Sequence, residues 1–276
     1  MKMQNKNGSL ESTDATKELV NIFKAAEHTL FSESTLKKKD LTTHFEIFKN
    51  IKKQKRNDND YFLEMVYVTF YSGFKAKTVT DKKPAIKNIF SDFEKVSKYD
   101  DTKVQKIIDG KKVIGHRQKI NGIIHNANQF KAIKKQFGSF DNYLASFGNT
   151  EKDEALFELI KDLKKHFKYL GGITVFHFLT DIGFNVLKPD RVICRIFNRL
   201  GLLDNETDKF EVIKVGRKIA SATKYPIRYI DIIFVLYGQV DEKKEFGLKE
   251  GICLSTNPMC ELCGMYDFCV YKNKKN

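Results

Sequence analysis

The chain has 276 residues, enough for a full hydrophobic core in one domain or in two interlocked ones. Its 49 Lys and Arg residues exceed its 35 Asp and Glu residues, for a formal net charge of +14. That excess suits binding to nucleic-acid phosphates, although a basic protein without such a partner would show the same balance. The sequence lacks the roughly 18 consecutive apolar residues of a membrane span and the apolar core of a signal peptide. We therefore expect a cytoplasmic protein that does not enter a membrane.

Apolar residues at helical spacing predict helices along most of the chain. Residues 1–15 are polar and predict a disordered tail. The first half then shows helical patterns over 17–30, 43–53, 61–74, 84–96, 101–109 and 117–137. The second half continues with 140–147, 151–167, 174–182, 191–200, 209–224 and 226–240. Without an alternating strand pattern, and with only four prolines, the sequence predicts an all-α fold.

Two glycines, Gly171 and Gly172, separate the predicted helices 151–167 and 174–182. A tight turn of small residues leaves backbone N–H groups exposed at the start of the following helix, where they can hold a phosphate. An ordinary connection between helices also contains such glycines, so the turn alone leaves both interpretations open.

Asp190 follows a proline and precedes the helical pattern 191–200. An aspartate in this position is a common helix N-cap. A carboxylate at the start of a helix can also face a cleft, so the local pattern fits a capping role and a catalytic role equally well.

Four cysteines near the end of the chain have the spacing C-x6-C-x2-C-x5-C: Cys253, Cys260, Cys263 and Cys269. Four thiolates this close together can ligate one metal centre, and sulfur ligands favour zinc or an iron–sulfur cluster. A structural zinc site usually has two separated C-x2-C pairs, whereas this spacing has one. Unligated thiols are a third interpretation.

These motifs, in this order, resemble the helix-hairpin-helix (HhH-GPD) DNA glycosylases of the endonuclease III type, over about residues 58–273. The cysteine spacing is similar to that family's 4Fe-4S loop, and 187–199 resembles its aspartate segment. The turn 169–174 resembles its hairpin, with Thr174 in place of the second glycine. The resemblance implies a catalytic Asp190, a 4Fe-4S cluster on the four cysteines, and DNA contacts from Gly171, Gly172, Thr174 and Arg191.

The segment 114–127 is similar to 3-methyladenine DNA glycosylase I, and this likeness spans about residues 61–182. Two departures accompany it. The zinc ligands that this family has near its N-terminus lack a counterpart here, because the first cysteine is Cys194. Its base-recognition glutamate aligns with Val68, so we expect the pocket to recognise its base differently.

Tyr67 and Tyr71 lie four residues apart on one face of the predicted helix 61–74. Aromatic faces stack on flipped bases, and a cationic alkylated base gains a cation–π interaction as well. Core packing explains most aromatic residues of this helix, but these two are our candidates for a base pocket.

The resemblance also implies a mechanism and a domain organisation. Lyases of the family use a lysine early in the second hairpin helix, and 174–178 contains no lysine, so we expect a monofunctional enzyme. We expect two helical lobes: 58–182, ending in the hairpin, and 16–57 plus 183–276, containing the cluster loop 253–269.

The predicted function is base-excision repair. A monomeric, nucleoid-associated DNA glycosylase would flip out a damaged base, an alkylated purine by preference, from double-stranded DNA and hydrolyse its N-glycosidic bond through Asp190. The alternatives are a bifunctional glycosylase/AP lyase acting on damaged pyrimidines and a non-catalytic DNA-binding iron–sulfur module.

Overall fold

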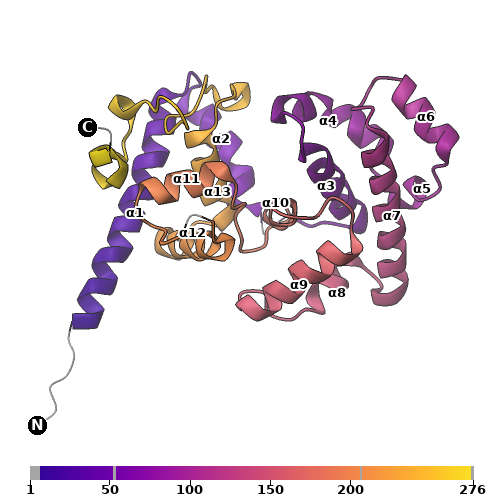
Figure 1. The fold of residues 1–276 in the computed structure, drawn as a ribbon, viewed down its shortest axis with the longest axis horizontal. Coiled ribbons are helices and arrows are strands. Elements are labelled where there is room, and N and C mark those ends of the chain that lie inside the picture. The colour runs from indigo at the N-terminus through magenta and orange to yellow at the C-terminus, as the bar shows by residue number, and fades with distance from the viewer. Residues whose placement is uncertain (1–6, 52–53, 206, 275–276) are drawn as a thin grey trace, which may run out of the picture. The chain divides into compact units, whose positions relative to one another are not determined.

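The computed structural model describes residues 7–51, 54–205 and 207–274 and contains thirteen α-helices within them (Figure 1). In these ranges the only extended pairing is an isolated bridge between Lys243 and Leu248. The all-α fold predicted from the sequence is therefore confirmed. Contacts divide the chain into two compact units, Met1–Ile51 with Asn185–Asn276, and Lys52–Phe184. Such units do not show that either part folds by itself, so the predicted lobe boundaries stay a prediction.

The first unit is built around one almost entirely buried helix. Its helices are α1 (Asn7–Glu33), α2 (Lys38–Lys49), α11 (Arg191–Arg199), α12 (Lys209–Thr223) and α13 (Ile227–Gly238). Helix α13 buries Tyr229, Ile230, Phe234 and Tyr237 against its neighbours. Short 3-10 turns follow it: η2 (Lys244–Phe246), η3 (Cys260–Leu262), η4 (Tyr266–Phe268) and η5 (Val270–Lys274). Helix α13 is apolar on nearly all sides, so it lies in the middle of this unit's core. Helix α11 and the cysteine loop pack against it.

The second unit is organised around α7. Its helices are α3 (Asp58–Tyr71), α4 (Ala76–Phe90), α5 (Phe93–Val96), α6 (Asp101–Asp109), α7 (Arg117–Phe137), α8 (Phe140–Ala145), α9 (Asp153–His166) and α10 (Thr174–Asp181). The core here is aromatic. Phe130 of α7 stacks on Phe140 with ring centroids 4.4 Å apart and meets Phe62 edge-on at 5.4 Å. Such pairs add to the stabilisation from area burial alone.

Several helix boundaries differ from those predicted. The pattern 43–53 corresponds to α2 (Lys38–Lys49), and the pattern 84–96 divides between α4 and α5. Helix α1 begins at Asn7, so residues 7–15 are helical rather than part of a disordered tail, while 1–6 lie outside the described residues. No proline or further glycine after Gly8 interrupts the backbone hydrogen bonds of the helix that buries Phe23. Pro84 does not begin a helix but lies inside α4. It is exposed, so water can reach the carbonyl that it leaves without a partner. Within the described ranges, the helices are too short or too polar to cross a membrane.

Candidate active site and cysteine loop

Asp190 is the N-cap of α11, and both of its carboxylate oxygens have partners. Oδ1 accepts hydrogen bonds from the backbone N–H groups of Val192 (2.9 Å) and Ile193 (3.1 Å). Oδ2 lies 3.0 Å from Nζ of Lys188, and the aspartate side chain keeps 21% of its surface exposed. A carboxylate at this position is stabilised by the helix dipole as well as by its donors. The side chain is thus a fixed anion that solvent, or a ligand, can still reach.

A second carboxylate, that of Asp231, holds the loop that precedes Asp190. Asp231 of α13 is buried, accepts the Lys188 backbone N–H at 2.9 Å, and pairs with Nη1 of Arg228 at 2.8 Å. Burial raises the pKa of Asp231, while the positive charges of Arg228 and Lys188 act in the opposite direction. Sequence analysis did not identify this residue, although an aspartate inside the apolar pattern 226–240 is a usable signal.

The far end of α11 is fastened to the cysteine loop by two arginines. Arg199 donates to the Leu254 carbonyl (2.7 Å) and to Sγ of Cys253 (3.3 Å), and its guanidinium lies 4.5 Å from the centroid of the Tyr271 ring. Arg195, one turn earlier, donates to the Cys253 carbonyl at 3.0 Å. The sequence resemblance included both arginines but gave them no role. In the structure they connect the helix that begins at Asp190 to the loop that carries the cysteines.

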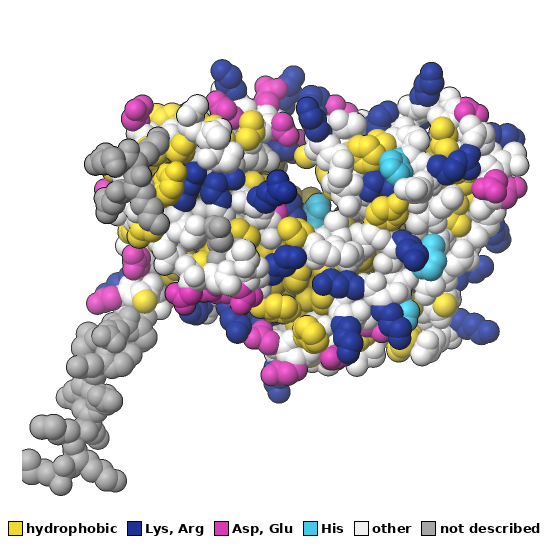
Figure 2. Space-filling view, viewed as in Figure 1, with side chains coloured by type: hydrophobic (Ala, Val, Ile, Leu, Met, Phe, Trp, Pro, Cys, Tyr) yellow, Lys and Arg dark blue, Asp and Glu magenta, His cyan; other side chains and the backbone are white. Residues whose placement is uncertain are grey.

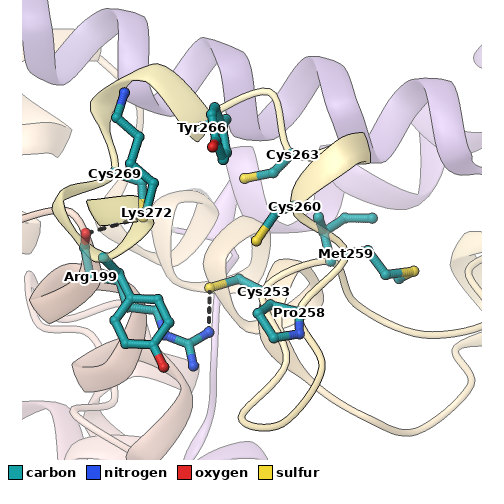
Figure 3. Close-up of a pocket in the computed structure, with 11 residues that line it drawn as sticks. Arg199, Cys253, Pro258, Met259, Cys260, Cys263, Tyr266, Cys269 and Lys272 are labelled. Atoms are coloured by element: carbon teal, nitrogen blue, oxygen red, sulfur yellow. Dashed lines mark hydrogen bonds between the residues drawn. The ribbon is translucent and has the colours of Figure 1, made fainter. Parts of the chain in front are cut away.

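All four cysteines line one cavity of about 210 Å³. Figure 3 shows the sulfur atoms of Cys253, Cys260 and Cys263 facing this space, with Arg199 beside Cys253. The hydroxyl of Tyr237 donates to Sγ of Cys263 at 3.2 Å. Nowhere in the described ranges do three or more His, Cys, Asp or Glu side chains converge closely enough to hold a metal ion. The thiols therefore surround a space instead of meeting at one point.

The turn between α9 and α10 forms a compact hairpin. Leu170 is fully buried, whereas Gly171 and Gly172 are exposed, and Gly172 has a left-handed backbone with φ +53°. The Thr174 N–H donates to the Gly171 carbonyl at 3.0 Å, and the Thr174 hydroxyl donates to the same oxygen. Helix α10 begins at Thr174 without a side-chain cap. Thr174 has ordinary helical geometry, so its departure from the family's glycine does not prevent the turn.

Tyr67 and Tyr71 share one face of α3, and an ammonium group covers that face. Nζ of Lys83 lies 4.7 Å from the centroid of the Tyr67 ring and 5.8 Å from that of Tyr71. The Tyr71 hydroxyl lies 3.0 Å from Oγ1 of Thr80, and its ring centroid is 5.5 Å from that of His177. Burial raises the pKa of Tyr67 to about 12, so its hydroxyl stays protonated at neutral pH.

A family model described as methyladenine glycosylase matches residues 49–190, just over half of the chain. The chain belongs to the methyladenine glycosylase family. It is a DNA glycosylase of base-excision repair, an enzyme that hydrolyses N-glycosidic bonds, and DNA is its partner. The match contains the hairpin and ends at Asp190, whereas the cysteine loop lies outside it. The predicted class of enzyme is thus confirmed, and it fits the helix-hairpin-helix superfamily suggested by the sequence.

Solved structures of DNA glycosylases are similar to this glycosylase. The 3-methyladenine DNA glycosylase I from Staphylococcus aureus is 26% identical over 46% of this chain and 77% of that chain, with a TM-score of 0.41. The 8-oxoguanine DNA glycosylase of Thermotoga maritima is 17% identical over 80% of this chain and 94% of its own, with a TM-score of 0.49. The Methanocaldococcus jannaschii 8-oxoguanine glycosylase/lyase, in complex with a 15mer DNA containing 8-oxoguanine, is 18% identical over 77% and 94%, also at 0.49.

The visible face of this glycosylase in Figure 2 carries Lys and Arg side chains on both units. Figure 2 shows Lys and Arg side chains scattered over the visible face of each unit, with Asp and Glu side chains among them. Arg191 is exposed in the first turn of α11, next to Asp190. On the face that Figure 2 shows, the positive charge does not gather into one patch.

Proposed function

We propose that this glycosylase removes alkylated purines from double-stranded DNA by simple hydrolysis, with Asp190 as the catalytic carboxylate. The proposal depends on how the Asp190 side chain is held and on its exposure to solvent. Two backbone N–H groups and the Lys188 ammonium hold it as an oriented anion, and part of its surface stays open. The capping role and the proposed catalytic role are then compatible, because the hydrogen bonds that cap α11 also hold the carboxylate in place.

The chemistry requires such an anion. Breaking the bond between base and deoxyribose builds positive charge on the sugar, and a fixed negative charge beside it lowers the energy of the transition state. The same carboxylate can orient the attacking water and accept its proton. The hairpin helix has no lysine over 174–178 to form a Schiff base, so the proposed reaction ends with an intact abasic strand.

The substrate class follows from the tyrosine face of α3. The Lys83 ammonium already lies over Tyr67 and Tyr71, so these rings accept a cation. A positively charged alkylated purine would make the same contact once Lys83 moves aside. Such a base also leaves readily without protonation. Val68 at the position of the family's base-recognition glutamate is fully buried, which favours recognition by charge and shape over a hydrogen bond.

The DNA contacts in this proposal come from the hairpin and from Arg191. The uncapped start of α10, with Gly171 and Gly172 exposed beside it, can take a phosphate on its backbone N–H groups. Arg191 would bind a neighbouring phosphate as a side-chain cation. We propose that the enzyme acts as a monomer on the nucleoid in the cytoplasm, where its substrate would be.

The cysteine loop fits a 4Fe-4S cluster. Its donors are four soft sulfurs that surround one cavity, and both Arg199 and Tyr237 donate to sulfurs as they would to thiolates. Cys253, Cys260, Cys263 and Cys269 would hold the cluster, which would shape the loop. Anaerobically purified protein should then be brown, with equal amounts of iron and sulfide, whereas colourless protein carrying one zinc would contradict this assignment.

The central experiment measures base release from alkylated duplex DNA by the wild type and by Asp190→Asn. We expect the substitution to lower the rate about 100-fold or more, because it removes the charge and keeps the shape. Asp208→Asn is the matched control, since Asp208 caps α12 in the same way and should be dispensable for the reaction. Equal release by wild type and Asp190→Asn would contradict the assignment.

The alternatives give different results in the same assay. A covalent adduct after borohydride treatment on an abasic duplex would identify a lyase. DNA binding without release of any base from a panel of single defined lesions would identify a non-catalytic module. Release of oxidised pyrimidines in preference to alkylated purines would change the substrate class and leave the role of Asp190 in place.

A further inference from the structure

Asn126 of α7 makes a two-way hydrogen-bond pair with the backbone just before the hairpin. Its Nδ2 donates to the Lys168 carbonyl at 3.0 Å, and its Oδ1 accepts from the Lys168 N–H at 2.8 Å. Asn126 is 1% exposed. Both groups of one peptide residue are thus held by one buried amide, as a neighbouring strand would hold them. These two hydrogen bonds fix the position and direction of the backbone at Lys168, where the chain enters the turn.

One turn earlier on α7, Gly122 gives the hairpin room. A Cβ at Gly122 would lie 2.5 Å and 2.8 Å from two carbons of the Tyr169 ring and 3.4 Å from Cβ of Lys168. Any side chain at this position would therefore push the ring off the helix. Tyr169 itself has a left-handed backbone with φ +64°, which is unfavourable for a residue with a Cβ and needs support from its surroundings.

Lys119 supplies a third contact on the same face. Its Nζ lies 4.4 Å from the centroid of the Tyr169 ring and donates to the Thr69 carbonyl at 2.5 Å, near the C-terminus of α3. Lys119, Gly122 and Asn126 are three and four residues apart, which places them on one face of α7. We call these three residues the hairpin seat. They lie within the segment whose likeness to 3-methyladenine DNA glycosylase I was noted from the sequence.

We propose that the hairpin seat orients the turn 169–174, so that the backbone N–H groups at the start of α10 face a DNA phosphate, and that Asn126 and Gly122 are positioning residues for DNA binding. This inference rests on the proposed role of the hairpin. Each residue of the hairpin seat has one part in this role. The Lys119 ammonium lies over the Tyr169 ring, and Gly122 leaves room for that ring. The Asn126 amide pairs with the backbone of Lys168.

The test measures affinity for an undamaged duplex over a series of salt concentrations. A phosphate whose charge the protein neutralises contributes about 0.9 to the slope of log K against log salt concentration, and the start of a helix carries about half a positive charge. We expect Asn126→Ala to weaken binding about 10-fold and to lower the slope by up to about 0.5. Asn128→Ala is the matched control, since Asn128 is an exposed asparagine on the same helix and should change neither quantity. A merely destabilised protein would show fewer active molecules with an unchanged slope.

A second variant keeps the test decisive if Asn126→Ala folds poorly. Gly122→Ala removes no hydrogen bond and acts only by displacing the Tyr169 ring, so it should also lower the slope. Tyr169→Gly removes that ring and suits the left-handed backbone, and the double variant should recover the slope that Gly122→Ala loses. Additive losses in the double variant would show that Gly122 does not act through Tyr169 and would overturn this part of the proposal.

A third variant distinguishes the role of the hairpin in DNA binding from the role of the hairpin seat in orienting it. Gly171→Asp places a negative charge on the exposed turn, where a built Cβ meets nothing within 4 Å. If it lowers the salt slope while Asn126→Ala and Gly122→Ala leave it unchanged, the hairpin binds DNA and the seat inference is wrong. If none of the three changes the slope, the proposed role of the hairpin fails and the seat inference fails with it.

Discussion

The two candidate sites of this glycosylase are both turns at the start of a helix, but they are held in different ways. The loop that carries Asp190 is fixed mainly by charged side chains, with Asp231 beneath it and Arg199 at the other end of α11. The hairpin is fixed by a neutral amide and a missing side chain, together with the ammonium group of Lys119. In this glycosylase the site that needs a fixed anion is held by ion pairs, whereas the site that acts through its backbone is held by contacts that imitate backbone pairing.

The largest expected effect comes from breaking the ion pair beneath Asp190. Asp231→Ala removes the buried carboxylate that pairs with the Arg228 guanidinium and accepts the Lys188 N–H. We expect the free energy of unfolding to fall by about 3–5 kcal/mol, as is usual when one member of a buried pair is removed. Urea unfolding followed by circular dichroism measures this. Asp231→Asn keeps an acceptor for the Lys188 N–H and should lose less. Equal losses would show that the hydrogen bond from the Lys188 N–H contributes little and that the ion pair with Arg228 accounts for the effect.

Arg199→Lys breaks the charged support at the other end of α11. Lysine keeps the charge but cannot donate to Leu254, Ser255 and Cys253 together as the guanidinium does. We expect a loss of about 2 kcal/mol and a lower iron content of the purified protein. Arg191→Lys is the control, because Arg191 is exposed on the same helix and should stay within about 0.5 kcal/mol of the wild type.

How far the sequence could predict this arrangement depended on the kind of support. The helices, the four cysteines and Asp190 each have a local pattern, so they could be identified directly. Arg199 and Asp231 act through partners 54 and 43 residues away. The local sequence marks Asp231 only as a charge inside an apolar helix, and Arg199 only as part of the segment that resembles the family. The hairpin seat was less visible still. The pattern 119, 122 and 126 looks like a helix with a solvated basic face until the backbone of 168 is placed against it.

The charged member of the hairpin seat predicts a pH dependence. Burial lowers the pKa of Lys119 to about 8 from 10.5, so above pH 8 the unfolded chain binds more protons at this residue than the folded one. The penalty for burying the charge is complete below pH 8 and fades as pH rises towards 10.5. Relative to Lys119→Met, the free energy of unfolding of the wild type should therefore rise by up to about 1.4 kcal/mol per pH unit in this window. A difference that stays constant with pH would mean that Lys119 is not desolvated.

The smallest expected effect separates the two roles of Asp190. Asparagine caps a helix about as well as aspartate, so Asp190→Asn should change the free energy of unfolding by only a few tenths of a kcal/mol, whereas Asp190→Ala should cost about 1 kcal/mol. Asp208→Ala at the start of α12 should cost the same. Base release should follow a different order, with both Asp190 variants inactive and Asp208→Ala active. If Asp190→Asn retained activity while Asp190→Ala lost it, capping alone would explain the residue. The loss of base release has to be compared with the change in the free energy of unfolding. Only the two measurements together show whether this position requires a carboxylate or merely a hydrogen-bond acceptor.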